Sequence, residues 1–103
     1  MGCYRGKLDI IAAILMVASR NPKKTQILYQ ANLSFRVLQK YLAEVSGASL
    51  ICFEDETQRY ALTLKGKAFL EAYSQYSKTS RHAEKIIGEV YLKKQTLEKL
   101  VNQ

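Results

Sequence analysis

The residues with the clearest chemistry are basic and amide side chains gathered in the first half of the 103-residue sequence, which carries a formal net charge of +7. Residues 1–43 hold seven lysines and arginines and a single acidic residue, Asp9. Such an excess attracts polyanions, either the phosphate backbone of a nucleic acid or an anionic membrane surface. A basic chain can also be charged for solubility alone. The structural elements that position these side chains are therefore needed to distinguish a binding surface from a merely soluble one.

Two short helices joined by a tight turn are predicted to position them. Thr25 is expected to be the N-cap of a helix over residues 26–31, and residues 32–34 form the turn. Ser34 then caps a helix that ends near Val45. The apolar residues of this helix repeat at i, i+3, i+4 and i+7 and so form one buried face, made of Leu38, Tyr41, Leu42 and Val45. This pattern is typical of a helix-turn-helix.

The opposite face of the second helix carries side chains suited to a major groove, which is wide enough for one helix. Arg36 and Gln39 could contact guanine, adenine or phosphates there. Two lysines at the start of the first helix suit a phosphate. Phe35 is expected to fold inward beside Leu38. The residues predicted to contact double-stranded DNA are Lys23, Lys24, Thr25, Ser34, Arg36, Gln39, Lys40 and Arg59.

A β-hairpin is predicted directly after these helices. Residues 50–53 and 59–62 form its two short strands. A hairpin in this position is a wing, but residues 54–56 at its turn are all acidic. An acidic wing opposes a contact with phosphates. Cys52, on the first strand, is expected to be a small buried hydrophobe.

Residues 8–19 predict a helix that is apolar on most of its circumference, and such a helix is buried on two sides. One side can serve its own domain, and the other indicates a partner surface. The basic residues Arg5 and Lys7 before this apolar run are also found in signal peptides. Asp9 abuts the run, however, and the run is too short to span a bilayer. We therefore expect no membrane partner.

A long last helix is predicted from Leu64 to Asn102, with Thr63 as its cap. Ten of its positions step alternately by four and three residues, which is the a/d seam of a coiled coil. Two of the ten, Ser80 and Lys94, are polar. An isolated helix would leave this stripe in water, so we expect it to pair in a homodimer through Phe69, Tyr73, Tyr76, Ala83, Ile87, Val90, Leu97 and Val101. The alternative is a break near residues 77–80, with two shorter helices folded back on one monomer.

Nothing in the sequence favours an enzyme. The single histidine, His82, falls at a solvated c position of the heptad, and no acid pair, nucleophile–base arrangement or glycine-rich phosphate loop is present. Cys3 and Cys52 lack the spacing of metal ligands or of a disulfide framework, which favours a reducing, cytoplasmic compartment. We expect no catalytic activity, no cofactor, no metal and no small-molecule ligand.

Three stretches carry a resemblance to a known group: residues 23–35 (KKTQILYQANLSF), residues 38–42 (LQKYL) and residues 60–70 (YALTLKGKAFL). They resemble the archaeal winged-helix proteins, and most of all the small crenarchaeal ten-kilodalton DNA-binding proteins of the "a" class. That resemblance implies one winged helix joined to a long C-terminal helix that dimerises as an antiparallel coiled coil, with a chromatin-type function.

The expected fold class is therefore mainly α with a small β-hairpin. A winged helix-turn-helix over residues 1–63 is followed by a dimerisation helix over residues 64–103. The expected function is binding of double-stranded DNA by a homodimer, as a nucleoid-associated chromatin-type protein or a transcription regulator in the cytoplasm. The alternative is a winged helix used as a protein-interaction module without DNA contact, which the acidic wing favours.

Overall fold

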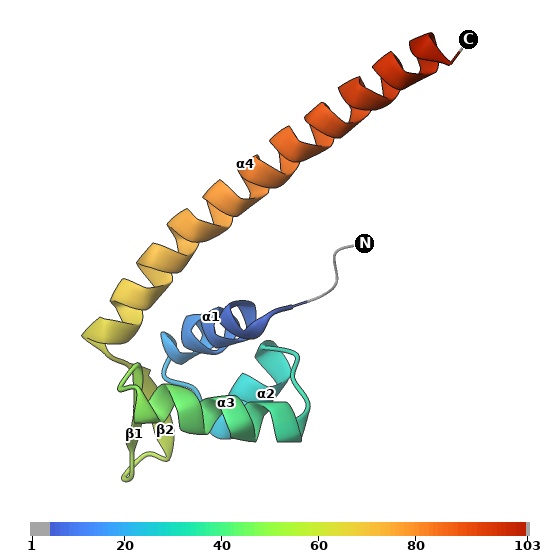
Figure 1. Ribbon diagram of the computed structural model, residues 1–103. Coiled ribbons are helices and arrows are strands. Elements are labelled where there is room, and N and C mark those ends of the chain that lie inside the picture. Colours follow the sequence, from blue (N-terminus) through green and yellow to red (C-terminus); the bar gives the residue numbers. More distant parts are fainter. Residues whose placement is uncertain (1–4, 103) are drawn as a thin grey trace. The chain divides into compact units, whose positions relative to one another are not determined.

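The computed structural model describes residues 5–102, and it confirms the predicted order of three helices, a hairpin and a long final helix (Figure 1). The chain divides into two compact units between Tyr73 and Ser74, so the first residues of the last helix belong to the first unit. The elements are α1 (Lys7–Ala18), α2 (Lys24–Gln30), α3 (Phe35–Gly47), β1 (Ile51–Glu54), β2 (Arg59–Leu62) and α4 (Leu64–Val101).

Helix α1 contacts α2, α3 and β2 within the first unit (Figure 1). Six of its twelve residues are buried within the single chain, which accounts for most of its apolar character. Leu8 and Met16 are the large apolar side chains of α1 that stay exposed. The surface that α1 leaves for a partner is therefore smaller than the sequence indicated.

The α2–α3 turn agrees with the prediction at one cap and corrects it at the other. The Ser34 hydroxyl accepts a hydrogen bond from the Val37 N–H (3.3 Å), as expected for the N-cap of α3. The prediction of Thr25 as the cap of α2 is wrong. That helix is capped at Lys23, whose N–H donates to the Gln26 side-chain oxygen (2.8 Å), and Thr25 lies inside the helix. A glutamine three residues after the cap satisfies the N–H of the capping residue, as in one half of a capping box.

The hairpin pairs β1 with β2 in an antiparallel register that aligns Ile51 with Leu62 and Glu54 with Arg59. Ile51 is buried in the core. The prediction that Cys52 is buried is wrong, because its side chain is exposed. Successive residues of a strand point to opposite faces, and a two-stranded sheet on a small domain has only one covered face.

Thr63 caps α4 as predicted, since its hydroxyl oxygen accepts the Gly66 N–H (3.0 Å). The same hydroxyl lies within hydrogen-bonding distance of the Ser49 and Leu50 carbonyl oxygens (2.7 and 2.9 Å). The Leu50 carbonyl also accepts the Thr63 N–H. These bonds fix the start of α4 against the segment that precedes β1. Gly66 lies so close to that segment that an added Cβ would stand 2.2 Å from the Leu50 carbonyl oxygen.

Replacing Gly66 by alanine is expected to lower the free energy of unfolding by about 1–3 kcal/mol, because a backbone carbonyl held by Thr63 has to move. Thermal unfolding measures the loss. Gly88→Ala is the matched control, since nothing lies within 4 Å of its added Cβ in the described chain, and alanine in mid-helix should stabilise by about 1 kcal/mol. Equal melting temperatures for the two variants would contradict this packing of α4.

The Tyr73 hydroxyl donates a hydrogen bond to the Asp9 carboxylate and so joins α4 to the first turn of α1 within the first unit. The pKa of Asp9 is lowered, first by this hydroxyl and then by the Gly6 N–H, which donates to the other carboxylate oxygen (3.0 Å). A lowered pKa means that the ionised form stabilises the fold. This contribution is complete above the ordinary aspartate pKa of about 3.9 and is lost as the pH falls through the lower value of the folded protein.

Tyr73→Phe should therefore destabilise the protein by about 1 kcal/mol at neutral pH. The ring, which stacks on Phe69, is kept. Because the lost interaction needs the charged carboxylate, the difference between parent and variant should shrink as the pH falls below about 4. Urea unfolding at pH 7 and at pH 3 gives the two differences. A difference of the same size at both values would show that Asp9 is not the partner that matters.

Helix α4 continues without a break from Leu64 to Val101, including residues 77–80. The alternative of two shorter helices folded back on one monomer is therefore wrong. Every described residue from Arg81 to the end is exposed in the single chain. Large apolar side chains of this part, among them Ile87, Val90 and Leu97, are each more than half exposed.

Candidate nucleic-acid interface

Helix α3 presents two clearly different faces. Leu38, Leu42 and Val45 are buried against the core, as the sequence predicted. Residues on the opposite side of the helix are exposed, and three of them are among the predicted DNA contacts: Arg36, Gln39 and Lys40. Ser34 is exposed as well, but its oxygen is used by the cap of α3. The outer face of α3 therefore offers a guanidinium, an amide and an ammonium group on neighbouring rows.

Helix α2 contributes the other basic groups of this surface. Lys23 caps the helix and Lys24 is its first residue, with Thr25 exposed beside them. Within residues 5–102, neither these lysines nor Arg36 and Lys40 form an ion pair with a carboxylate. We call Lys23, Lys24, Arg36 and Lys40 the basic set. Its four charges are available to an external anion.

Glu44, the acidic residue of α3, pairs with α1 instead of with the basic set. Its carboxylate lies 2.7 Å from the Lys7 ammonium, and this pair is exposed. The pKa of Lys7 is raised, first by its hydrogen bond to Glu44 and then by the charge of that carboxylate. Glu44 therefore offsets the charge of α1 rather than that of the basic set.

Phe35 departs from the prediction. It was expected to fold inward, and that is wrong: its side chain is 58% exposed. The Lys24 ammonium lies 5.0 Å from the centre of its ring, a cation–π distance that joins the starts of α2 and α3. The first turn of α3, capped by Ser34, leaves Phe35 at the surface, whereas Leu38, three residues further on, is buried.

Arg59 lies beside the basic set rather than at the tip of the hairpin. It is the first residue of β2, and its backbone pairs with Lys23 in an isolated bridge. Its guanidinium donates to the Asn21 carbonyl oxygen (2.8 Å), which fixes the α1–α2 connection. The wing turn itself is acidic and exposed at residues 54–56. Arg59 is thus partly committed to the fold.

Arg5, which the sequence indicated only as one of several positive charges, bonds to the turn between α2 and α3. Its guanidinium donates to the carbonyl oxygens of Ala31 and Asn32 (2.9 and 2.8 Å), where α2 ends and the turn begins. Asn32 has a positive φ of 54°, so this turn is tightly bent. No periodicity or motif connects Arg5 with a turn 26 residues away.

The eight predicted dimerisation residues fall into two groups. Phe69 packs against the core and Tyr73 bonds to Asp9, so both are held within the first unit. The other six are exposed in the single chain: Tyr76, Ala83, Ile87, Val90, Leu97 and Val101. Further apolar side chains widen this stripe, namely Ile86, Tyr91 and Leu100.

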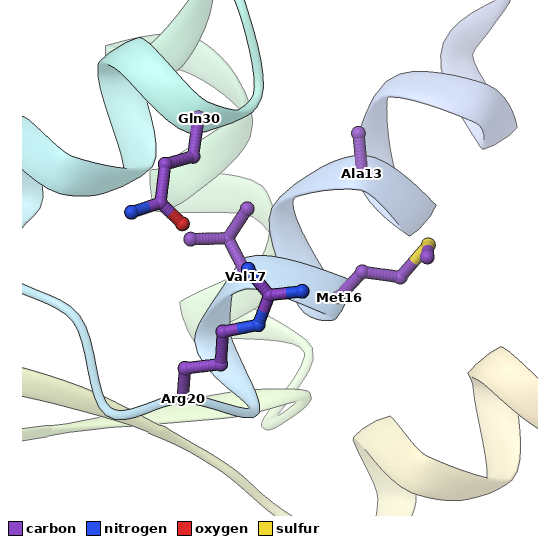
Figure 2. A pocket seen from close by; sticks show the side chains of 5 residues that line it. All are labelled: Ala13, Met16, Val17, Arg20 and Gln30. Atoms are coloured by element: carbon purple, nitrogen blue, oxygen red, sulfur yellow. The ribbon is translucent and has the colours of Figure 1, made fainter.

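An open surface hollow of about 440 Å³ lies between α1 and α2 (Figure 2). Val17 lies at its centre, Gln30 reaches toward it from α2, and Arg20 follows the end of α1. None of the predicted DNA-binding residues lines it. Within residues 5–102 there is no helix long and apolar enough to cross a membrane, and no cluster of side chains that could hold a metal ion.

Three comparisons with known proteins bear on this surface. No curated protein matches the sequence. A solved structure, that of Sso10a-2, described as a DNA-binding protein from Sulfolobus solfataricus, is similar to this chain with a TM-score of 0.69 and 25% sequence identity. The match covers 84% of this chain and 96% of that one. Residues 4–81 match the family described as "Winged helix-turn-helix", which is not an enzyme family. On its fold and on this match over most of its length, the chain belongs to the winged helix-turn-helix family.

Proposed function

We propose that the chain binds double-stranded DNA as a homodimer, with α3 in the major groove and the start of α2 against the phosphate backbone. The residues that make contact are Lys23, Lys24, Thr25, Ser34, Arg36, Gln39, Lys40 and Arg59. The winged helix-turn-helix over residues 1–63 binds, and residues 64–103 dimerise. The role is that of a chromatin-type, nucleoid-associated protein or a transcription regulator.

The observation that carries this proposal is the unpaired basic set on one helix-turn-helix. Four cations lie on the outer sides of α2 and α3, and within the described residues no carboxylate pairs with them. Charges that remain unpaired on a fold's surface raise the local concentration of polyanions. The similar structure of Sso10a-2, whose description is that of a DNA-binding protein, supports the same reading.

The dimer is supported by the apolar stripe of α4. Ile87, Val90 and Leu97 are each more than half exposed in the single chain. Burying an apolar side chain is worth about 1.5–3 kcal/mol, so a stripe of this length favours a second helix against it. The family resemblance adds that the two helices run antiparallel.

Binding of the parent protein to a duplex of mixed sequence, measured at several salt concentrations, tests the proposal. If each winged helix neutralises four phosphates, the logarithm of the binding constant should fall with the logarithm of salt concentration with a slope of about −3.6. Failure to bind any duplex at low salt would refute DNA binding.

A second function is favoured by the acidic wing. Residues 54–56 are exposed at the hairpin turn, where a phosphate contact would be repelled. This charge suits a basic protein partner, so the winged helix would be a protein-interaction module. Neutralising the wing as Glu54→Gln/Asp55→Asn/Glu56→Gln separates the two. The proposed DNA binder should bind duplex DNA more tightly after this change, whereas an interaction module should still not bind it.

A further inference from the structure

Phe35 occupies an unusual place for a large apolar side chain. It is the first residue of α3, the end of a helix-turn-helix recognition helix that comes closest to base edges in the major groove. Its ring is 58% exposed, and it stands among the basic set, next in sequence to Arg36. An anion bound by the basic set would bring its own surface against this ring.

The ring also has a contact within the protein. The Lys24 ammonium lies 5.0 Å from the ring centre, so the ring has a neighbour on one side. The fixed Ser34 cap sets the backbone from which Phe35 starts. Phe35 is thus an apolar side chain with a defined neighbour within a basic surface.

The major groove offers one apolar group to such a contact, the C5 methyl of thymine. Gln39 is one turn further along α3 on the same row as Phe35, and an amide there suits adenine. An apolar ring and an amide on one row match the methyl and the donor–acceptor edge of A·T pairs. Phosphates, by contrast, offer nothing that an aromatic ring prefers to water.

We propose that Phe35 contacts thymine methyl groups in the major groove and gives the protein a preference for thymine over uracil at the same base pair. This inference rests on the proposed function, that α3 enters the major groove of DNA. It adds an element of base readout to a surface whose other members are mainly suited to phosphates.

The experiment compares duplexes of one A·T-rich sequence, made either with thymine or with deoxyuridine, which pairs identically but lacks the methyl. The parent should bind the thymine duplex about fourfold more tightly for each methyl contacted. A G·C-rich duplex with 5-methylcytosine, which restores a methyl at the same place in the groove, should likewise bind better than its unmethylated form. Affinities are read by fluorescence anisotropy at one salt concentration.

Phe35→Ala should abolish the difference between thymine and uracil, while Phe35→Leu, which stays apolar, should keep part of it. Tyr29→Ala is the matched control, because Tyr29 is an aromatic residue of α2 that is 78% exposed, and its loss should leave the difference intact. Because Phe35 is exposed, its variants should fold, which circular dichroism checks.

Each outcome of these measurements supports or overturns the inference. Equal affinity of the parent for both duplexes overturns the inference and leaves DNA binding standing. If the difference between the thymine and deoxyuridine duplexes survives in Phe35→Ala, it arises from the DNA rather than from this ring, and the inference is also overturned. A loss of dimer in Phe35→Ala would make the ring an interface residue instead. Absence of all duplex binding refutes the proposed function, and the inference with it.

Discussion

Replacing both Arg36 and Lys40 by alanine is expected to weaken duplex binding by at least about tenfold and to flatten its dependence on salt. The two residues are one helical turn apart on the exposed side of α3, so both can reach the same DNA segment. If both neutralise phosphates, the log–log salt slope should become shallower by about 1.8. If Arg36 contacts a base instead, the slope should change by about half as much, and discrimination between sequences should fall.

The fold should not suffer from this change, since both side chains are exposed and neither forms an ion pair within residues 5–102. The matched control is Lys85→Ala/Lys99→Ala, which removes the same charge from two f positions of α4, opposite the predicted seam. A general loss of charge would weaken binding equally in both double variants. Parent-like affinity and salt slope in Arg36→Ala/Lys40→Ala would remove α3 from the interface and favour the protein-interaction module.

The sequence predicted those elements whose signal is periodic. The i, i+3, i+4 spacing of Leu38 and Leu42 placed the inner face of α3, and the exposed side followed from it. The heptad spacing likewise predicted one long helix, and α4 is continuous through the weak stretch at residues 77–80. Such patterns survive folding because they report which side of an element is buried, and burial dominates its free energy.

Single residues at the ends of elements were harder to predict. Phe35 and Cys52 are apolar and were both expected inside, yet both are exposed. Each lies where a helix or strand has just begun, and the direction of its side chain depends on the local cap or register rather than on composition. The prediction for the cap of α2 was wrong for a similar reason: the helix begins before Thr25, where the Lys23 N–H donates to the Gln26 side chain.

Contacts between distant residues were not predictable from one sequence. Arg5 on the α2–α3 turn and Tyr73 on Asp9 join segments 26 and 64 residues apart. Both use residues that the sequence had assigned elsewhere, Arg5 to the general basic charge and Tyr73 to the dimer seam. Their effect on the site is indirect, since Arg5 holds the turn that sets α3 and Tyr73 holds the start of α1.

Ile87→Asp is expected to convert a two-chain assembly into single chains. Ile87 is at an a position of the seam and is 67% exposed in the single chain, so the substitution removes little packing within the chain itself. In the proposed dimer the same position is buried against a second helix. An unpaired aspartate buried there costs several kcal/mol, so the two helices should separate. Sedimentation at micromolar concentration should give twice the chain mass for the parent and the mass of one chain for the variant.

His82→Asp is the control, because it introduces the same charge at a c position of the same helix and should leave the assembly intact. Circular dichroism separates dissociation from unfolding, since the first unit has its own core and should stay folded after α4 loses its partner. A parent of single-chain mass would refute the dimer. An Ile87→Asp variant with the parent's mass and melting temperature would mean that the seam runs along another face of α4, with Ile86, Tyr91 and Leu100 as the next residues to substitute.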